Sequence, residues 1–315
     1  MKIKIGMLWG LVAILAIGFI LTDNTILSWD YVTTKRLLRL AAMAVGAICV
    51  ACSAIMFQTL VGNRVLTPAI MGYEAVYLFW QSLLLLLLGT QGIAMLGISG
   101  NFIISTLLML VYSWLLYYWL FKRIKNDVYL LLLLGLVLSM VITTFSQFIQ
   151  LRISPGEFMV FQGLSFASFN RVQPETLLYA VLALLVVAIA MYKTRHVLDV
   201  MALGREQSIS LGLHHAQYMR FYLALIAILV AISTSLIGPV AFMGIFIANL
   251  TYALIHSHKH SLLFVMGCAI ALLLFLIAQL LVEHVFNYKT TVSILINLVC
   301  GLYFLLLMMR TRGMT

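Results

Sequence analysis

The feature that most constrains the fold of this chain is a series of long, nearly uninterrupted apolar segments. Each approaches the roughly 20 residues that an α-helix needs to cross about 30 Å of hydrocarbon. With 64% hydrophobic residues, 9% charged residues and a mean hydropathy of +1.13, a water-soluble globular fold is excluded. Because the segments are continuous rather than alternating, their backbone groups must be satisfied within helices. The sequence predicts an all-α polytopic membrane protein with a single transmembrane domain over residues 1–315. The ten predicted spans are 5–21, 40–60, 69–88, 103–121, 129–149, 176–192, 221–237, 240–255, 262–282 and 291–309.

Two of these spans have alternative interpretations. The first follows Lys2 and Lys4, as a signal peptide would, but no small-x-small cleavage site follows Leu21 and the chain soon returns to the membrane. We therefore predict that it is a span. The eighth, 240–255, is short and begins beside Gly238-Pro239, so a broken or re-entrant helix is its alternative.

The basic residues predict how the chain is oriented. If the N-terminus is cytoplasmic, ten spans return the C-terminus to the cytoplasm. Thirteen of the 19 Lys and Arg residues then lie on that side and six lie outside. An excess of Lys and Arg is typical of cytoplasmic loops. We expect both termini in the cytoplasm, and topology then accounts for most of the net charge of +10 without a nucleic-acid partner.

One compact polar segment, residues 195–220, interrupts the apolar sequence and lies in the cytoplasm in this topology. It contains Gly204 and Gly212, residues of a type that ends short helices. Its charged residues are Arg195, Asp199, Arg205, Glu206 and Arg220. We interpret the segment as a contact for a soluble cytoplasmic partner. A solvated connector is the alternative.

A faint internal repeat is also present. One span that begins with an arginine ends near Pro68, and a later one ends at Pro239, each proline being followed within a few residues by Met-Gly. In the predicted topology the first break is cytoplasmic and the second is external, as a pseudo-symmetric, inverted repeat requires. Helices interrupted at matching places in two halves are typical of a transport pathway.

Polar residues within the spans are candidates for a translocation path. Glu74 lies inside the third span, where burial of a carboxylate is expensive unless it is paired or hydrated. Its alternative is a structural hydrogen bond. In the fifth span Thr143, Gln147 and Gln150 share one face by i, i+4 and i+3 spacing. That face either lines a hydrated path or forms hydrogen bonds between helices.

No residue pattern predicts enzymatic chemistry or a bound cofactor. The chain has no Gly-Lys dipeptide and therefore no phosphate-binding loop, so any ATP hydrolysis belongs to a partner. His256, His258 and His260 alternate in a short cytoplasmic loop without nearby acids or cysteines, which favours a solvated turn over a metal site. Cys49 and Cys52 form a C-x-x-C inside an apolar span, where small packing residues are expected.

Four motifs occur in a fixed order along the chain. They are R-L-L-R at 36–39, T-P-A-I-M-G at 67–72, L-G-R-E-Q-S-I-S-L-G-L at 203–213 and G-P-V-A-F-M-G at 238–244. They resemble R-L-P-R, D-P-x-x-L-G, L-G-E-E-x-A-x-S-L-G-V and G-P-I-G-F-V-G in the permeases of iron-siderophore and vitamin B12 importers, the FecCD family. The resemblance extends from about residue 36 to the C-terminus.

This resemblance implies a ten-span permease subunit of a binding-protein-dependent ABC importer in the bacterial inner (cytoplasmic) membrane. The implied partners are a cytoplasmic ABC ATPase dimer, a second permease subunit (the same or a homologous chain) and a periplasmic or lipoprotein binding protein. A ferric siderophore is the implied substrate, with cobalamin or haem as the alternative. A secondary transporter that couples protons through Glu74 is the alternative outside this family.

Roles for individual residues also follow from the resemblance. The resemblance assigns six residues to the coupling helices, which sit in a cleft of the ATPase: Gly204, Arg205, Glu206, Ser210, Leu211 and Gly212. Arg36 and Arg39 match arginines that pair with acidic residues of the binding protein, and anchoring to lipid headgroups is their alternative. The span with Thr143, Gln147 and Gln150 lines the channel in that family.

The chain departs from the family pattern at two of these places. Residues 289–293 read K-T-T-V-S where the family has E-L-P-V-G, so Lys289 is expected to add an external docking charge. Arg205 replaces the first glutamate of the coupling loop, which implies a different pairing with the ATPase.

Overall fold

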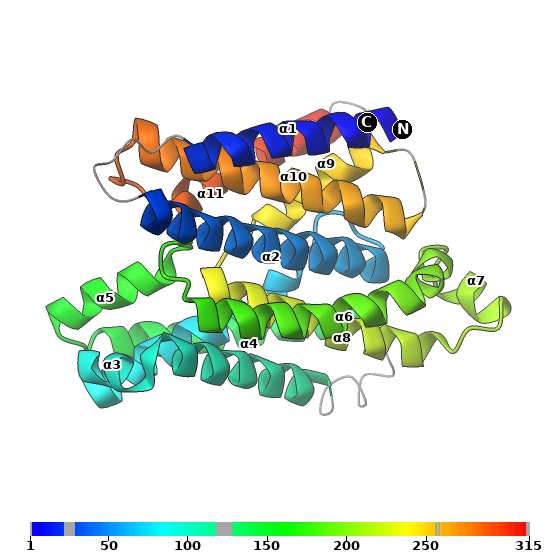
Figure 1. The fold of residues 1–315 in the computed structure, drawn as a ribbon. Coiled ribbons are helices and arrows are strands. Elements are labelled where there is room, and N and C mark those ends of the chain that lie inside the picture. Colours follow the sequence, from blue (N-terminus) through cyan, green and yellow to red (C-terminus); the bar gives the residue numbers. More distant parts are fainter. Residues whose placement is uncertain (1, 22–28, 118–127, 256, 258, 313–315) are drawn as a thin grey trace.

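The computed structural model describes residues 2–21, 29–117, 128–255, 257 and 259–312, and the regular structure within these ranges is helical. Most helices run roughly along one axis, with α7 at the end of the bundle where α1 begins and α11 ends (Figure 1). The elements are α1 (Lys2–Leu21), α2 (Trp29–Val61), η1 (Pro68–Met71), α3 (Tyr73–Leu115), α4 (Val128–Gln150), α5 (Pro155–Ser165), α6 (Pro174–Met201), α7 (Arg205–Ser210), α8 (His215–Ile237), α9 (Met243–Leu254), α10 (His260–Leu280), η3 (Leu281–Val285) and α11 (Val292–Arg312).

The predicted spans correspond to these helices once α3 is recognised as a hairpin. Its backbone leaves the helical region at Gly89 and Gly97. On either side, Trp80 Nε1 donates to Asn101 Oδ1 over 2.9 Å, and the Tyr73 hydroxyl lies 3.2 Å from Ser113 Oγ. These pairs require antiparallel arms, which correspond to the predicted span 69–88 and to the described part of the predicted span 103–121, up to residue 117. In the described ranges seven helices, α3 among them, are long and apolar enough to cross a membrane, and two shorter apolar helices are α9 and part of α11.

The eighth predicted span, 240–255, does not cross as a continuous helix. Its helix α9 has 12 residues, which is about 18 Å at 1.5 Å per residue and well short of a 30 Å hydrocarbon layer. The helix before it ends at Gly238, whose positive φ (φ 104°, ψ 179°) favours glycine and where a Cβ would lie 3.0 Å from the Ala167 backbone. The expectation of a full span is thus corrected, and the alternative of a broken helix is confirmed.

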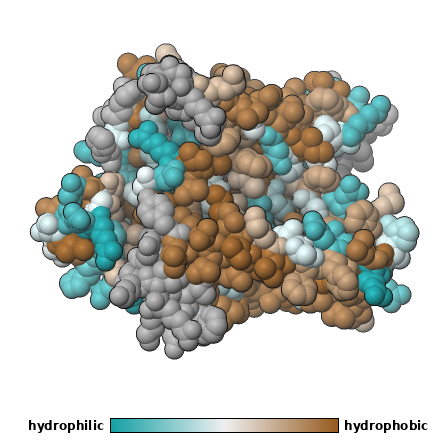
Figure 2. Space-filling view, turned by 180° about the vertical axis from the view of Figure 1, so that it is seen from behind, coloured by the Kyte–Doolittle hydropathy of each residue, from teal (hydrophilic) through white to brown (hydrophobic). Residues whose placement is uncertain are grey.

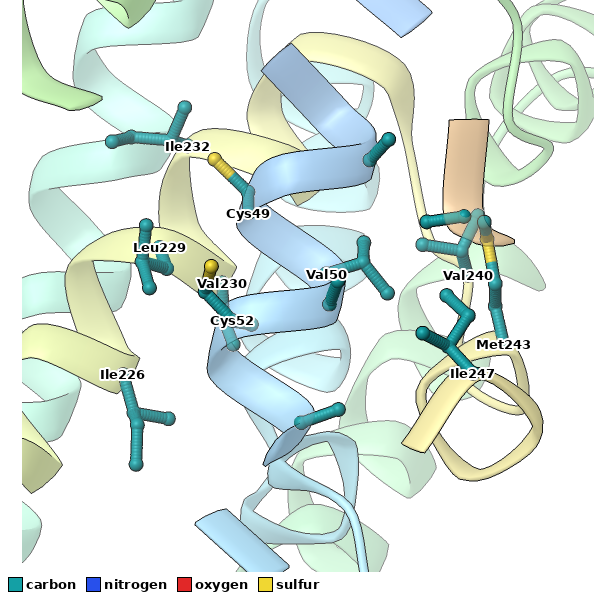
Figure 3. Close-up of a cluster of buried hydrophobic side chains, with 14 of the residues drawn as sticks. Cys49, Val50, Cys52, Ile226, Leu229, Val230, Ile232, Val240, Met243 and Ile247 are labelled. Carbon is teal, nitrogen blue, oxygen red and sulfur yellow. The ribbon is translucent and has the colours of Figure 1, made fainter. Parts of the chain in front are cut away.

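The interior of the bundle is formed mainly by α2, α8 and α10, with α1, α3, α4 and α6 towards the outside. Small residues let α2 lie close to its neighbours, and a Cβ at Gly46 would lie 2.9 Å from the Ile237 side chain. Cys49 and Cys52 lie among apolar side chains of α8, while Val50 faces the segment after Pro239 (Figure 3). Both cysteines are buried and free, as packing residues are expected to be.

The surface has the distribution of polarity expected of a membrane protein. A hydrophobic region covers the middle of the bundle, and hydrophilic residues gather towards its two ends (Figure 2). One hydrophilic end carries α7, which belongs to the polar segment predicted to be cytoplasmic. The start of α1 and the end of α11 lie at that same end, as the predicted topology requires.

Candidate functional site

The segment predicted to contact a cytoplasmic partner folds into one short helix between two glycines in unusual conformations. Gly204, at φ 101° and ψ 170°, precedes α7, and Gly212, at φ 84°, follows it. The Gly212 N–H donates to the Ile209 carbonyl (2.9 Å) and the Leu213 N–H to that of Ser208 (3.0 Å). This pair of bonds is a Schellman motif, which needs a left-handed residue at the Gly212 position. The glycines therefore determine the shape of the loop.

The inner side of this loop is anchored, whereas its outer side is exposed. Ser208 is buried, and its hydroxyl donates to the Arg205 carbonyl (2.9 Å) and lies 2.8 Å from His215 Nδ1. In contrast, Ile209 and Leu211 are 52% and 63% exposed. The predicted coupling residues that lie exposed on this loop are Gly204, Arg205, Glu206, Ser210, Leu211 and Gly212.

A cavity of about 420 Å³ lies beside α7 and carries positive charge. Arg205 and Arg220 line it together with His214 and His215, and no acidic residue of the described chain does so. The guanidinium groups are thus available to a negatively charged partner. Arg205 occupies the position that the family pattern gives to a glutamate, so the loop has reversed its charge at this place.

At the opposite end of the bundle, two arginines of α2 converge on one carboxylate of η3. Arg36 Nη2 lies 3.3 Å from Glu283 Oε2, and Arg39 Nη1 lies 3.3 Å from Glu283 Oε1. Gln279 Nε2 also donates to Oε1 over 2.7 Å, and Arg36 donates to the carbonyl of Phe19 and stacks over its ring. These contacts join α1, α2 and α10.

This network corrects the expectation that both arginines face an external partner. The side chain of Arg36 is 6% exposed and belongs to the bundle interior, whereas that of Arg39 is 26% exposed. Lys289, which follows Glu283 in the sequence, is exposed. Burial and the Glu283 carboxylate raise the pKa of the Tyr288 hydroxyl, so this group stays protonated and neutral. Sequence reasoning missed Glu283 because an acid at the end of an apolar segment does not reveal its partner.

The two helix breaks meet inside the bundle. Glu74 Oε1 accepts a hydrogen bond from the Val240 N–H (3.1 Å), which joins the first turn of α3 to the segment before α9. A cavity of about 30 Å³ lies between the breaks, lined by Pro68 and Ala69 from one and by Val240 and Ala241 from the other. Glu74 therefore makes the structural hydrogen bond that was one of its two interpretations.

The polar face predicted on the fifth span is found on α4, away from the cavity that Glu74 lines. Thr143 and Gln147 are exposed, and the Thr143 hydroxyl donates to the Ser139 carbonyl of its own helix (2.8 Å). Gln150 donates to Ser146 Oγ over 3.1 Å. Within a single chain, Glu74 and these three residues therefore do not belong to one site.

One histidine of the predicted solvated turn is buried instead. His260 is 2% exposed and lies against Asp199 and Thr59, whereas His256 and His258 lie outside the described residues. The sequence did not reveal this because Asp199 is distant along the chain. Among the described residues, no group of three or more His, Cys, Asp or Glu side chains could hold a metal ion.

Interrupted helices that meet inside a membrane bundle define a class of protein, the polytopic helical transport proteins. The chain belongs to the FecCD transport family, whose model matches residues 6–310. It is 35% identical over 309 residues to the petrobactin import system permease protein YclO of Bacillus subtilis (strain 168), covering 98% of each chain. It is 30% identical over 283 residues to the petrobactin import system permease protein FatC of Bacillus anthracis, covering 90% of this chain and 80% of that protein.

Solved structures share the fold. A structure described as an inward-facing conformation of a metal-chelate type ABC transporter matches with a TM-score of 0.81 at 20% identity, covering 96% of this chain and 97% of the other. PsaBC from Streptococcus pneumoniae, in complex with Fab, matches with a TM-score of 0.61 at 14% identity, covering 86% and 90%. The predicted family is confirmed. The chain is a multi-pass permease subunit of an ABC importer and is not itself an enzyme.

Proposed function

We propose that this chain carries a ferric siderophore of the petrobactin type across the cell membrane, driven by a separate cytoplasmic ATPase dimer. The main observation in support of an ATP-driven mechanism is the exposed α7 loop between α6 and α8. The siderophore assignment is supported by the two relatives, which are named as petrobactin import permeases and align with most of this chain. Family membership favours this function over a proton-coupled secondary transporter.

The α7 loop is suited to docking in a cleft of the ATPase. Leu203, Ile209 and Leu211, in or next to α7 at one end of the bundle (Figure 1), expose 54%, 52% and 63% of their surfaces. Exposed apolar residues rimmed by polar groups are typical of protein–protein contacts. Because Arg205 and Arg220 line the adjacent cavity, the ATPase partner is expected to present acidic side chains there.

Orientation and the remaining partners complete the proposal. The α7 end of the bundle is cytoplasmic, with both termini, and the Glu283 end faces a substrate-binding protein. Arg39 and Lys289 contribute positive charge to that docking surface. The exposed Thr143 and Gln147 of α4 line the translocation path in an assembly with a second permease chain, since an isolated polar face in contact with lipid is unfavourable.

The substrate is tested by uptake in cells that lack their own petrobactin permease. Cells that express this chain with its ATPase and binding protein should accumulate radioactive iron supplied as ferric petrobactin. They should not accumulate labelled cobalamin or haem. Uptake of either of these, with no uptake of ferric petrobactin, would contradict the proposal.

Docking is tested with a matched pair of exposed apolar residues. Leu211→Asp should release the ATPase during purification, because a carboxylate would be placed in the apolar contact. The control is Val65→Asp, which places the same charge on an apolar residue that is 37% exposed in the segment before η1. Equal ATPase retention in both variants would contradict the proposed docking surface.

A further inference from the structure

Three side chains from different helices form a continuous hydrogen-bonded relay at the α7 end of the bundle. Asp199 Oδ1 of α6 lies 2.6 Å from His260 Nδ1 and accepts the His260 backbone N–H over 2.8 Å. On the other side of the ring, His260 Nε2 lies 2.9 Å from Thr59 Oγ1 of α2. His260 is the first residue of α10 and its side chain is 3% exposed. The relay therefore joins α6, α10 and α2.

The relay keeps its hydrogen bonds in either protonation state of His260. In the neutral ring, Nδ1–H donates to the Asp199 carboxylate and Nε2 accepts from the Thr59 hydroxyl. In the imidazolium, both nitrogens donate, and the Thr59 hydroxyl turns to the Ile55 carbonyl, 2.8 Å away. A contact that survives proton gain or loss is suited to mechanical connection rather than to sensing pH.

The place of the relay in the chain links the α7 loop to the helix breaks. Asp199 lies in the last turn of α6, and only residues 202–204 separate α6 from α7. Thr59 lies in the last turn of α2, whose chain continues through η1 to Glu74 and its bond with Val240.

A second group of bonds fastens α9 at the same level. Asn249 Nδ2 donates to the Arg64 carbonyl over 2.9 Å, as does Gln58 Nε2 over 2.8 Å. The Arg64 guanidinium lies over the Tyr252 ring, 4.9 Å from its centroid. A displacement of the end of α6 is thus resisted by α2 and α10, which are in turn connected to α9.

We propose that Asp199, His260 and Thr59 are positioning residues that transmit movement of the α7 loop on the ATPase to the broken helices in the bundle centre. This role rests on the proposed function, because it requires an ATPase on that loop. None of the three residues lies on the exposed docking surface, so their removal should affect transmission rather than binding.

The test is the amount of ferric petrobactin imported per ATP hydrolysed, in membrane vesicles that contain this chain, its ATPase and its binding protein. His260→Phe keeps an aromatic ring but removes both hydrogen bonds. It should retain the ATPase and basal hydrolysis, while import per ATP falls about fivefold or more. Thr59→Val, a nearly isosteric change, should act in the same direction. Asp199→Asn retains a carbonyl oxygen that accepts from the backbone N–H and the Nδ1–H of His260, so this variant should keep import per ATP near the wild-type ratio.

His196 provides a matched control, because it lies 3.9 Å from the other oxygen of Asp199 but is 79% exposed. His196→Phe should leave import per ATP unchanged. Import per ATP in the double variant His260→Phe with Asp199→Ala should be no lower than in the more impaired of the two single variants, since both substitutions remove the same connection.

Two results would overturn the inference. If His260→Phe and Thr59→Val lower only the amount of folded protein and leave import per ATP unchanged, the residues are merely structural. If His196→Phe lowers the ratio as much as His260→Phe, the relay is not the cause. A wild-type chain that retains no ATPase would instead refute the proposed function itself, and this is measured separately by co-purification.

Discussion

Arg36 Nη2 lies 3.3 Å from Glu283 Oε2, although 247 positions separate the two residues. Both side chains are almost fully enclosed, at 6% and 4% exposure. Removal of one member of a buried ion pair leaves the other charge uncompensated, which is strongly unfavourable. This pair therefore has a different role from the neighbouring, partly exposed Arg39.

Replacement of the two arginines should separate stability from docking. Arg36→Ala is expected to lower the free energy of unfolding by about 3–5 kcal/mol, the usual consequence of breaking a buried pair. Arg39→Ala should have a smaller effect, because that side chain is 26% exposed. Thermal unfolding of the two purified variants in detergent measures the difference. Equal small losses of stability would contradict the structural assignment of Arg36.

Docking of the binding protein should depend on the exposed charges at the Glu283 end. Arg39→Gln, which removes the charge without placing a second carboxylate beside Glu283, combined with Lys289→Glu is expected to weaken association with the binding protein mainly at low salt, since charges near the surface act through steering and are screened. Basal hydrolysis by the ATPase complex without binding protein should stay unchanged. Titration of the binding protein at two ionic strengths checks this, and unaltered affinity at low salt would favour lipid anchoring.

The conformation of Gly212 should control energy coupling. Its φ of 84° is left-handed, and nothing lies within 4 Å of an added Cβ, so a substitution acts through backbone strain and not through a clash. Gly212→Ala is expected to cost about 1–2 kcal/mol in this loop and to reduce transport and ATPase retention. Gly212→Asn should be tolerated better, because Asn adopts this conformation more readily. Co-purification of the ATPase with each variant provides the measurement. Identical behaviour of Ala and Asn would contradict this explanation.

Substitution of Glu74 should distinguish its two interpretations. Glu74→Gln keeps an oxygen that accepts from the Val240 N–H, so transport should be retained if the hydrogen bond is what matters. Glu74→Ala leaves that N–H without this partner, an effect typically of about 1–3 kcal/mol, and should reduce transport and stability together. Uptake and thermal unfolding are measured in parallel. Complete loss of uptake in stable Glu74→Gln protein would instead indicate a proton-coupling carboxylate.

The exposed face of α4 should be accessible to water in the assembled transporter. Gln147→Cys is expected to react with a membrane-impermeant, hydrophilic thiol reagent, because the proposed path is hydrated. Phe145→Cys, on the opposite side of α4 and 60% exposed in the single chain, should be protected by lipid. Mass spectrometry of labelled protein gives both rates. Labelling of Phe145→Cys alone would remove Gln147 from the translocation path.

The sequence alone determined the class of protein and the places of its helices. A helix satisfies its own backbone groups, so the length and continuity of an apolar segment predict a span locally. The motif at 203–213 likewise predicted a helix-forming loop, because Gly204 and Gly212 determine backbone conformation within a few residues. These properties require no knowledge of neighbouring helices.

Tertiary structure alone decided which distant residues meet. Arg36 and Arg39 contact the same Glu283 carboxylate, but Arg36 is more enclosed because it also packs against Phe19 of α1. His260 is buried because the end of α6 brings Asp199 beside it. Hydropathy describes the tendency of a segment to enter the membrane, whereas the partner of a charge depends on the positions of whole helices relative to one another.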